Sequence, residues 1–226
     1  MRVPATCTTE GMQGYVSPLV RVFILDDHDI VRRGLRDLLT KRDITVVGDT
    51  GSATQATRTI LELRPHVMVL DVQLQDGSGV QVCRDVRSVD PSIRGVLLTS
   101  AGDEEALMLS VLAGAAGALL KLAGTHDIVE AVRRVRAGRA LLDHADTERI
   151  ADHVRARAEN LHPPLTPRQA ATLSLVIAGH TDQQIAEEHH QPMTLVRDEV
   201  TTLIARLTTH SPQADKKGPG RHRRNA

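Results

Sequence analysis

The sequence predicts an α/β protein, in which a doubly wound, five-stranded parallel sheet is followed by a small all-α unit. Short aliphatic runs alternate with longer amphipathic segments five times between residues 21 and 137. Such alternation is typical of βα units, whose strands are buried on both faces and therefore read as nearly continuous apolar runs. After residue 141 only helical patterns remain, which places the all-α unit at the C-terminal end.

The elements of the α/β part follow from these runs. Pro65 and Pro91 mark crossings from helix to strand, and Gly77, Gly79 and Gly117 mark turns. The predicted strands are 21–25, 44–48, 66–70, 93–98 and 116–120. The predicted helices are 29–40, 52–63, 78–88, 103–113 and 125–137.

Three helices are predicted in the C-terminal unit. Thr166 is a good N-cap with Pro167 at the first helical position, and this helix ends near Ala178. Thr181 and Gln184 form a capping box that opens a short helix. A longer helix from Met193 to Leu207 completes a helix-turn-helix pattern.

The domain boundaries follow from changes in composition. We expect a disordered extension at 1–19, an α/β domain at 20–140, a linker helix within 141–163, a helix-turn-helix domain at 164–210 and a disordered basic tail at 211–226.

Composition limits the classes of function. The chain has 226 residues, zero formal net charge, and only Tyr15 and Phe23 as aromatics, so binding of nucleic acid by stacking on bases is excluded. Two cysteines, Cys7 and Cys83, are too few for a disulfide framework or a zinc site and favour a reducing compartment. With no apolar run of transmembrane length, we expect a soluble cytoplasmic protein without a membrane partner.

Acidic residues end two of the predicted strands. Asp26 and Asp27 follow the first strand and Asp71 follows the third. Ligands of open α/β sheets bind at the carboxyl ends of the strands, where these carboxylates would meet. Clustered carboxylates repel one another unless a hard cation lies between them, so the pattern predicts a Mg²⁺ site. Any one of these residues alone would more often cap a helix or turn.

Five short motifs carry a resemblance to a known family. Residues 21–138 resemble a response-regulator receiver domain, and residues 165–207 resemble the helix-turn-helix of the LuxR-type (NarL/FixJ) class. The resemblance implies a flavodoxin-like sheet with strand order 2-1-3-4-5. The motifs are Asp26-Asp27-His28, Val31-Arg32-Arg33-Gly34-Leu35, Leu70-Asp71-Val72, Leu98-Thr99-Ser100 and Leu112-Ala113-Gly114-Ala115.

The same resemblance implies roles for the strand-end residues. Asp71 is the expected phosphoacceptor for a sensor histidine kinase. Lys121 is expected to pair with a phosphoryl oxygen, and the Thr99 hydroxyl to donate a hydrogen bond to it. The expected ligands of Mg²⁺ are Asp26, Asp27, Asp71 and the backbone carbonyl of Gln73. His28 is expected to be a solvent-facing residue at a helix start.

Two receiver positions depart from the family pattern. Ala118 stands three residues before Lys121, where the family usually has Tyr or Phe, and Gln75 replaces the usual proline after Leu74. Both departures concern the readout of phosphorylation and not its chemistry. Residues 103–137 correspond to the usual dimer face of the family.

The longest C-terminal helix is the expected DNA-reading element, with Thr194, Arg197, Asp198 and Thr201 as its contacts. Asp198 and Glu199 place acids where the family presents Asn and His or Tyr to DNA. Between 165 and 210 the acids outnumber the bases: Arg168, Arg197 and Arg206 stand against Asp182, Glu187, Glu188, Asp198 and Glu199. Because cations supply much of the affinity for DNA, this surface is poorly suited to it. The tail at 211–226 is basic and either binds DNA or is a solvated terminus.

Three functions compete. The first is a two-component response regulator that binds DNA, controls transcription and forms a homodimer, or a heterodimer with a related regulator. The second is a receiver-type regulator whose C-terminal domain has lost or weakened DNA binding and contacts a protein instead. The third, a Mg²⁺-dependent phosphohydrolase, needs an acid–base residue where the chain has Gln73, which cannot shuttle a proton. We therefore expect no enzymatic activity beyond slow self-dephosphorylation.

Overall fold

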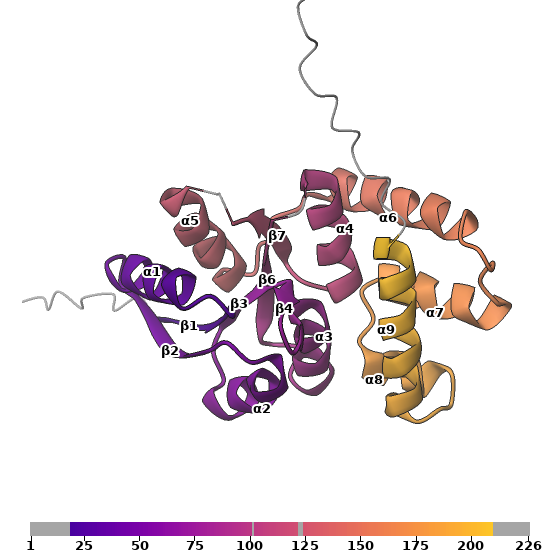
Figure 1. Cartoon of the computed structure of the whole chain (residues 1–226), viewed down its shortest axis with the longest axis horizontal. Helices are drawn as coiled ribbons and strands as arrows, with labels where there is room; N and C mark the ends of the chain where they lie inside the picture. The colour runs from indigo at the N-terminus through magenta and orange to yellow at the C-terminus, as the bar shows by residue number, and fades with distance from the viewer. Residues whose placement is uncertain (1–18, 101, 122–123, 210–226) are drawn as a thin grey trace, which may run out of the picture.

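The computed structural model describes residues 19–100, 102–121 and 124–209 (Figure 1). The expected extension at 1–19, except Leu19, and the expected tail at 211–226 lie outside the described residues.

A five-stranded parallel sheet forms the first part of the molecule (Figure 1). Its strands are β1 (Val20–Leu25), β2 (Ile44–Thr50), β3 (Val67–Asp71), β6 (Arg94–Thr99) and β7 (Gly117–Leu120). The order β2-β1-β3-β6-β7 confirms the predicted order 2-1-3-4-5. A two-residue antiparallel pair, β4 (Gln73–Leu74) with β5 (Gly77–Ser78), was not predicted, because strands this short carry no periodic pattern.

Helices cover both faces of the sheet, as a doubly wound fold requires. Alternate residues of β1 show the division: Val22 and Ile24 pack against α1 (Asp29–Thr40) and α5 (Thr125–Arg136). Phe23 and Leu25 point the other way, toward α2 (Ala53–Leu63), α3 (Gly79–Val89) and α4 (Asp103–Ala113). All four of these β1 side chains are fully buried.

Four helices form the C-terminal part: α6 (His144–Glu159), α7 (Pro167–Ile177), α8 (Asp182–Glu188) and α9 (Met193–Thr209). The two predicted capping residues are confirmed. The Thr166 hydroxyl accepts a hydrogen bond from Gln169 N at 3.2 Å, and the Thr181 hydroxyl accepts one from Gln184 N at 3.3 Å. In both motifs the glutamine side chain returns a bond to the N-cap backbone, so these helix starts are fixed by their own sequence.

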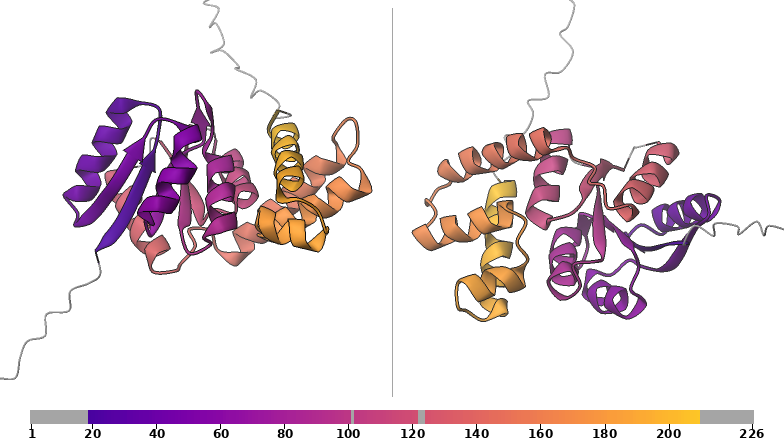
Figure 2. Two further views of the ribbon diagram at one scale, coloured as in Figure 1. Left: turned by 90° about the horizontal axis from the view of Figure 1, so that it is seen from below. Right: turned by 180° about the vertical axis from the view of Figure 1, so that it is seen from behind.

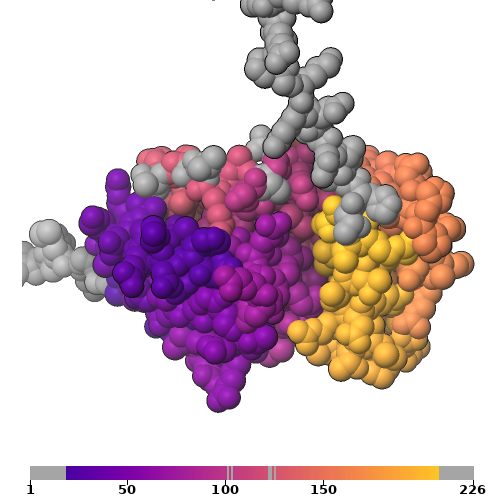
Figure 3. Space-filling view, viewed as in Figure 1, coloured from indigo at the N-terminus to yellow at the C-terminus, as the bar shows by residue number. Residues whose placement is uncertain are grey.

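The two parts share a hydrophobic core. Met108, Val111 and Leu112 of α4 pack in one cluster with apolar side chains of α6, α7, α8 and α9. Figure 2 shows α6 running beside α4, and Figure 3 shows the orange and yellow C-terminal helices against the magenta part of the α/β domain. The α4 portion of the expected dimer face is therefore partly covered within the same chain.

Candidate functional site

The three strand-end carboxylates meet as predicted. β1 and β3 are neighbours in register, with Leu25 opposite Leu70, so Asp26 and Asp71 emerge side by side. Both residues are almost completely buried, at 0% and 2% exposure. Ligand atoms of Asp26, Asp27, His28 and Asp71 all lie within 4.8 Å of one another. Oxygen donors crowded in this way fit a hard divalent cation.

Lys121 supplies the positive charge of the site. It follows β7, and its Nζ donates to Asp71 Oδ2 at 2.6 Å and lies 2.9 Å from Asp26 Oδ2. Burial alone would lower the pKa of Lys121, but its hydrogen bonds to Asp71 and Asp26 raise the pKa above the ordinary value. The amine therefore remains charged between the two carboxylates.

Asp71 is held in a setting that disfavours its charged form. Burial raises its pKa above the ordinary value, the hydrogen bond from Lys121 opposes that shift, and the charge of Asp26 adds to it. The backbone N–H of Gln73 donates to Asp71 Oδ1 at 3.3 Å. A cation among the acids would favour the ionised carboxylate that a nucleophile needs.

Gly79 lets α3 begin directly against this site. A Cβ at this position would lie 2.1 Å from the carbonyl oxygen of Asp71, so only glycine fits. Gly79 therefore allows the backbone of α3 to approach that of β3 closely, in addition to marking the predicted turn.

Thr99 and Gln73 lie on the side of the site that faces the C-terminal helices. Thr99 ends β6, is 4% exposed, and its carbonyl accepts a hydrogen bond from Lys121 N at 2.8 Å. Gln73 lies in β4, two residues after Asp71, and its side chain is exposed. Both residues line one cavity together with residues of α9.

His28 is at the N-cap position of α1 with its side chain 66% exposed, as expected. Its imidazole nevertheless contacts the acids, with Nδ1 2.7 Å from Asp27 Oδ1 and 3.2 Å from Asp26 Oδ1.

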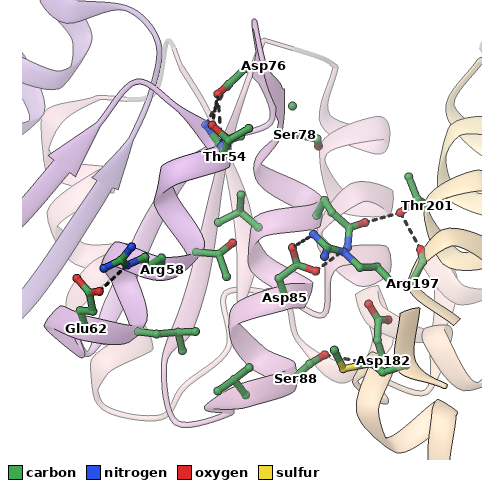
Figure 4. A pocket seen from close by; sticks show the side chains of 18 residues that line it. Thr54, Arg58, Glu62, Asp76, Ser78, Asp85, Ser88, Asp182, Arg197 and Thr201 are labelled. Carbon is green, nitrogen blue, oxygen red and sulfur yellow. Dashed lines mark hydrogen bonds and ion pairs between the residues drawn. The ribbon is translucent and has the colours of Figure 1, made fainter. Parts of the chain in front are cut away.

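The expected DNA contacts on α9 divide into two pairs. Thr194 and Asp198 are exposed. Arg197 instead forms an ion pair with Asp85 of α3, and the Thr201 hydroxyl donates to Gln81 Oε1 of α3 at 2.7 Å (Figure 4). Half of the predicted contact set is therefore engaged by α3 of the α/β domain.

The expectation that Glu199 faces DNA is wrong. Its side chain is only 13% exposed and lies against α7, where Arg168 Nη2 is 3.2 Å and the Thr172 hydroxyl 3.4 Å from Glu199 Oε2. The glutamate occupies a position on α9 that turns toward the interior of the helical unit.

A buried ion pair also joins the two parts. Arg84 of α3 and Asp182, the first residue of α8, are each 1% exposed, and Arg84 Nε donates to Asp182 Oδ1 at 2.9 Å. The other guanidinium nitrogens donate to the carbonyl oxygens of Leu112 at 2.7 Å and His180 at 3.2 Å. Ser88 Oγ accepts from Asp182 N at 3.1 Å, so α3 meets the start of α8 through both side chain and backbone (Figure 4).

Comparison with known proteins agrees with the fold. A family model of the response regulator receiver domain matches residues 22–133. The DNA-binding transcriptional activator DevR/DosR of Mycobacterium tuberculosis is 39% identical over 192 residues, which cover 84% of this chain and 88% of that protein. The chain belongs to the response regulators.

Solved structures extend the likeness to both parts of the chain. A LuxR-family two-component response regulator from Aurantimonas sp. SI85-9A1 has 29% identity and a TM-score of 0.53, and the match covers 60% of this chain and 97% of that one. The RcsB response regulator of Salmonella typhimurium shares the fold over 86% of this chain and 94% of its own, with 20% identity and a TM-score of 0.50. Within the described residues, no helix is both long and apolar enough to cross a membrane.

Proposed function

We propose that this response regulator receives a phosphoryl group on Asp71 from a sensor histidine kinase. The observation that carries the proposal is the buried Asp71 carboxylate, 2.6 Å from Lys121 Nζ and beside two further acids. A carboxylate oxygen of Asp71 attacks phosphorus, the P–N bond to the donor histidine breaks, and the imidazole leaves as an acyl phosphate forms.

The surrounding residues have distinct parts in this transfer. Asp26, Asp27, Asp71 and the backbone carbonyl of Gln73 would hold Mg²⁺, which when bound neutralises charge on the phosphoryl group. Lys121 gives up its hydrogen bond to Asp71 and pairs with a phosphoryl oxygen. The Thr99 hydroxyl donates to another. The amide of Gln73 cannot act as a general acid or base, so we expect slow self-dephosphorylation and no turnover of other substrates.

We further propose that the receiver spans 20–140, the linker helix lies within 141–163, and the domain at 164–210 binds DNA to control transcription. Thr194, Arg197, Asp198 and Thr201 are the proposed contacts. DevR/DosR, which is described as a DNA-binding transcriptional activator, supports this assignment. Because Arg197 and Thr201 already bind α3, DNA and the receiver compete for the same side chains. The DNA-binding form is proposed to be a homodimer, or a heterodimer with a related regulator, acting in the cytoplasm.

A second candidate is a protein-interaction regulator with weak or absent DNA binding. The engagement of α9 by α3 and the excess of acids between 165 and 210 favour it. This candidate keeps the phosphorylation chemistry and differs only in the partner of the C-terminal domain.

Incubation with phosphoramidate and MgCl₂ tests the phosphoacceptor. Intact-mass spectrometry should show one added phosphoryl group on the full chain, none on Asp71→Asn, and none after chelation of Mg²⁺. Asp37→Asn, which changes an exposed acid on α1, should behave as wild type. Phosphorylation that persists in Asp71→Asn would exclude this residue as the acceptor.

Retention of genomic DNA fragments by the full chain with bound beryllofluoride, across a salt series, separates the two candidates. Enrichment of one sequence that is lost in Arg197→Ala supports a transcription factor. Absence of salt-dependent retention in every condition contradicts DNA binding and leaves the protein-interaction regulator.

A further inference from the structure

One cavity lies beside the acidic site, between the receiver and α9. Its volume is about 350 Å³, and its walls include Gln73 and Thr99 from the receiver and Thr201, Ile204 and Thr208 from α9. Gln73 and Thr99 are also residues that would contact the phosphoryl group or the cation in the proposed function. The same two residues therefore face the phosphorylation site on one side and the C-terminal domain on the other.

Ile204 lies at the junction of two hydrophobic cores. It packs against the receiver cluster that includes Leu70 and Leu109, and also against the cluster that joins α4 to the C-terminal helices. Among the described residues that make up these two clusters, Ile204 alone belongs to both. It is the apolar residue of α9 that contacts the receiver core next to the cavity.

The ion pair between Arg197 and Asp85 lies outside this cavity, whereas the hydrogen bond from Thr201 to Gln81 borders it. Arg197 and Asp85 line an adjoining, larger cavity of about 940 Å³ between α2, α3 and α9 (Figure 4), and neither borders the cavity beside Thr99. The ion pair therefore holds α9 on the receiver without bordering the cavity that Gln73 and Thr99 line.

We propose that Ile204 is the positioning residue through which phosphorylation of Asp71 changes the docking of α9. The inference rests on the proposed phosphorylation and adds the route of its readout. When the Thr99 hydroxyl turns toward a phosphoryl group and the Gln73 carbonyl toward the cation, the wall that faces Ile204 changes shape. Close-packed cores switch between discrete arrangements instead of deforming continuously. Ile204 therefore loses its packing contacts with the receiver core, and α9 docks less favourably.

The test uses the full chain with MgCl₂ and beryllofluoride as the phosphoryl analogue. Fluorine NMR reports whether the analogue binds, and hydrogen exchange of the peptide covering α9 reports docking. Four proteins are compared: wild type, Ile204→Ala, Ile204→Val and Arg197→Ala. Arg197→Ala is the matched control, because it weakens docking without touching the shared cavity.

We expect beryllofluoride to raise the exchange rate of α9 about fivefold or more in wild type, the size of a modest allosteric coupling. Arg197→Ala should exchange faster at the outset and still respond by a similar factor. Ile204→Ala should also exchange faster at the outset but show no further response. Ile204→Val, which removes one methylene and keeps most of the packing, should respond by an intermediate factor.

Other results overturn the inference. A response of Ile204→Ala equal to that of Arg197→Ala would show that coupling does not pass through Ile204. Bound analogue with unchanged exchange of α9 in wild type would also refute it, while leaving Asp71 as the phosphoacceptor. Failure of wild type to bind the analogue would refute the proposed phosphorylation together with the inference.

Discussion

Glu199 connects the first and last helices of the C-terminal domain. Its carboxylate accepts hydrogen bonds from Arg168 and from the fully buried Thr172, whose hydroxyl also lies 3.2 Å from His189 Nε2. Charge-assisted hydrogen bonds to a largely buried carboxylate stabilise a fold more than exposed ion pairs do. Glu199 therefore contributes to the stability of the domain and not to a nucleic-acid surface.

Glu199→Ala should lower the free energy of unfolding by about 1–3 kcal/mol, because Thr172 loses a charged acceptor and Arg168 its partner. The control is Asp198→Ala, which alters the exposed neighbour and should change stability by no more than about 0.5 kcal/mol. Urea unfolding of the full chain, followed by circular dichroism, measures both. Equal losses in the two variants would contradict the structural role of Glu199.

At the scale of elements, α2 begins with help from a distant segment. Its N-cap residue, Ser52, makes no capping hydrogen bond of its own. Asp76, in the turn between β4 and β5, accepts from Ala53 N at 2.8 Å and from Ser52 Oγ at 2.6 Å. These hydrogen bonds lower the pKa of Asp76 to about 2, and the bond from Ser52 makes the largest contribution. The small β4–β5 pair thereby ties α2 to the chain beside the acidic site.

The lowered pKa of Asp76 determines how the stability of the fold changes with pH. An aspartate whose pKa falls from 3.8 to about 2 on folding stabilises the fold fully above pH 4, and this contribution is lost as pH falls toward 2. Thermal melts of wild type and Asp76→Asn should therefore differ at pH 5 and converge near pH 2. A constant difference across this range would show that the charge of Asp76 does not cap α2.

At the scale of the whole molecule, Arg84 and Asp182 form a buried ion pair between the two domains. The pair is completely desolvated, and both partners lie at the domain boundary. Removing one partner of such a pair leaves an uncompensated buried charge, which costs about 3–5 kcal/mol. The domains can avoid that cost by separating.

Arg84→Met should therefore open the molecule, and small-angle scattering should report a larger radius of gyration than for wild type. Arg84→Met combined with Asp182→Leu replaces the pair with apolar side chains and should restore the compact form. Arg58→Met is the control, since Arg58 is exposed and its ion pair is with Glu62 of its own helix. An unchanged radius for Arg84→Met would show that other contacts suffice for docking.

Prediction from sequence succeeded where the signal was local. Apolar runs and helix caps identified the five sheet strands and the starts of α7 and α8, because each depends on residues within a few positions. The acids at the ends of β1 and β3 were also predictable, since strand ends of a parallel sheet share one edge. Arg84 and Asp182 are separated by 98 positions, and no periodic pattern connects them. An arginine within an amphipathic helix is indistinguishable in sequence from an ordinary solvated residue.

Docking within one chain has a consequence for protein dosage. The segment between Arg136 and His144 is short, and Leu141 N donates to Ala116 O at 2.8 Å, so α6 starts close to the receiver. A tethered partner acts at an effective concentration that does not change when more protein is made. Overproduction therefore raises the number of closed molecules and open molecules in equal proportion. Only an event that alters the equilibrium within each molecule changes the fraction with a free α9.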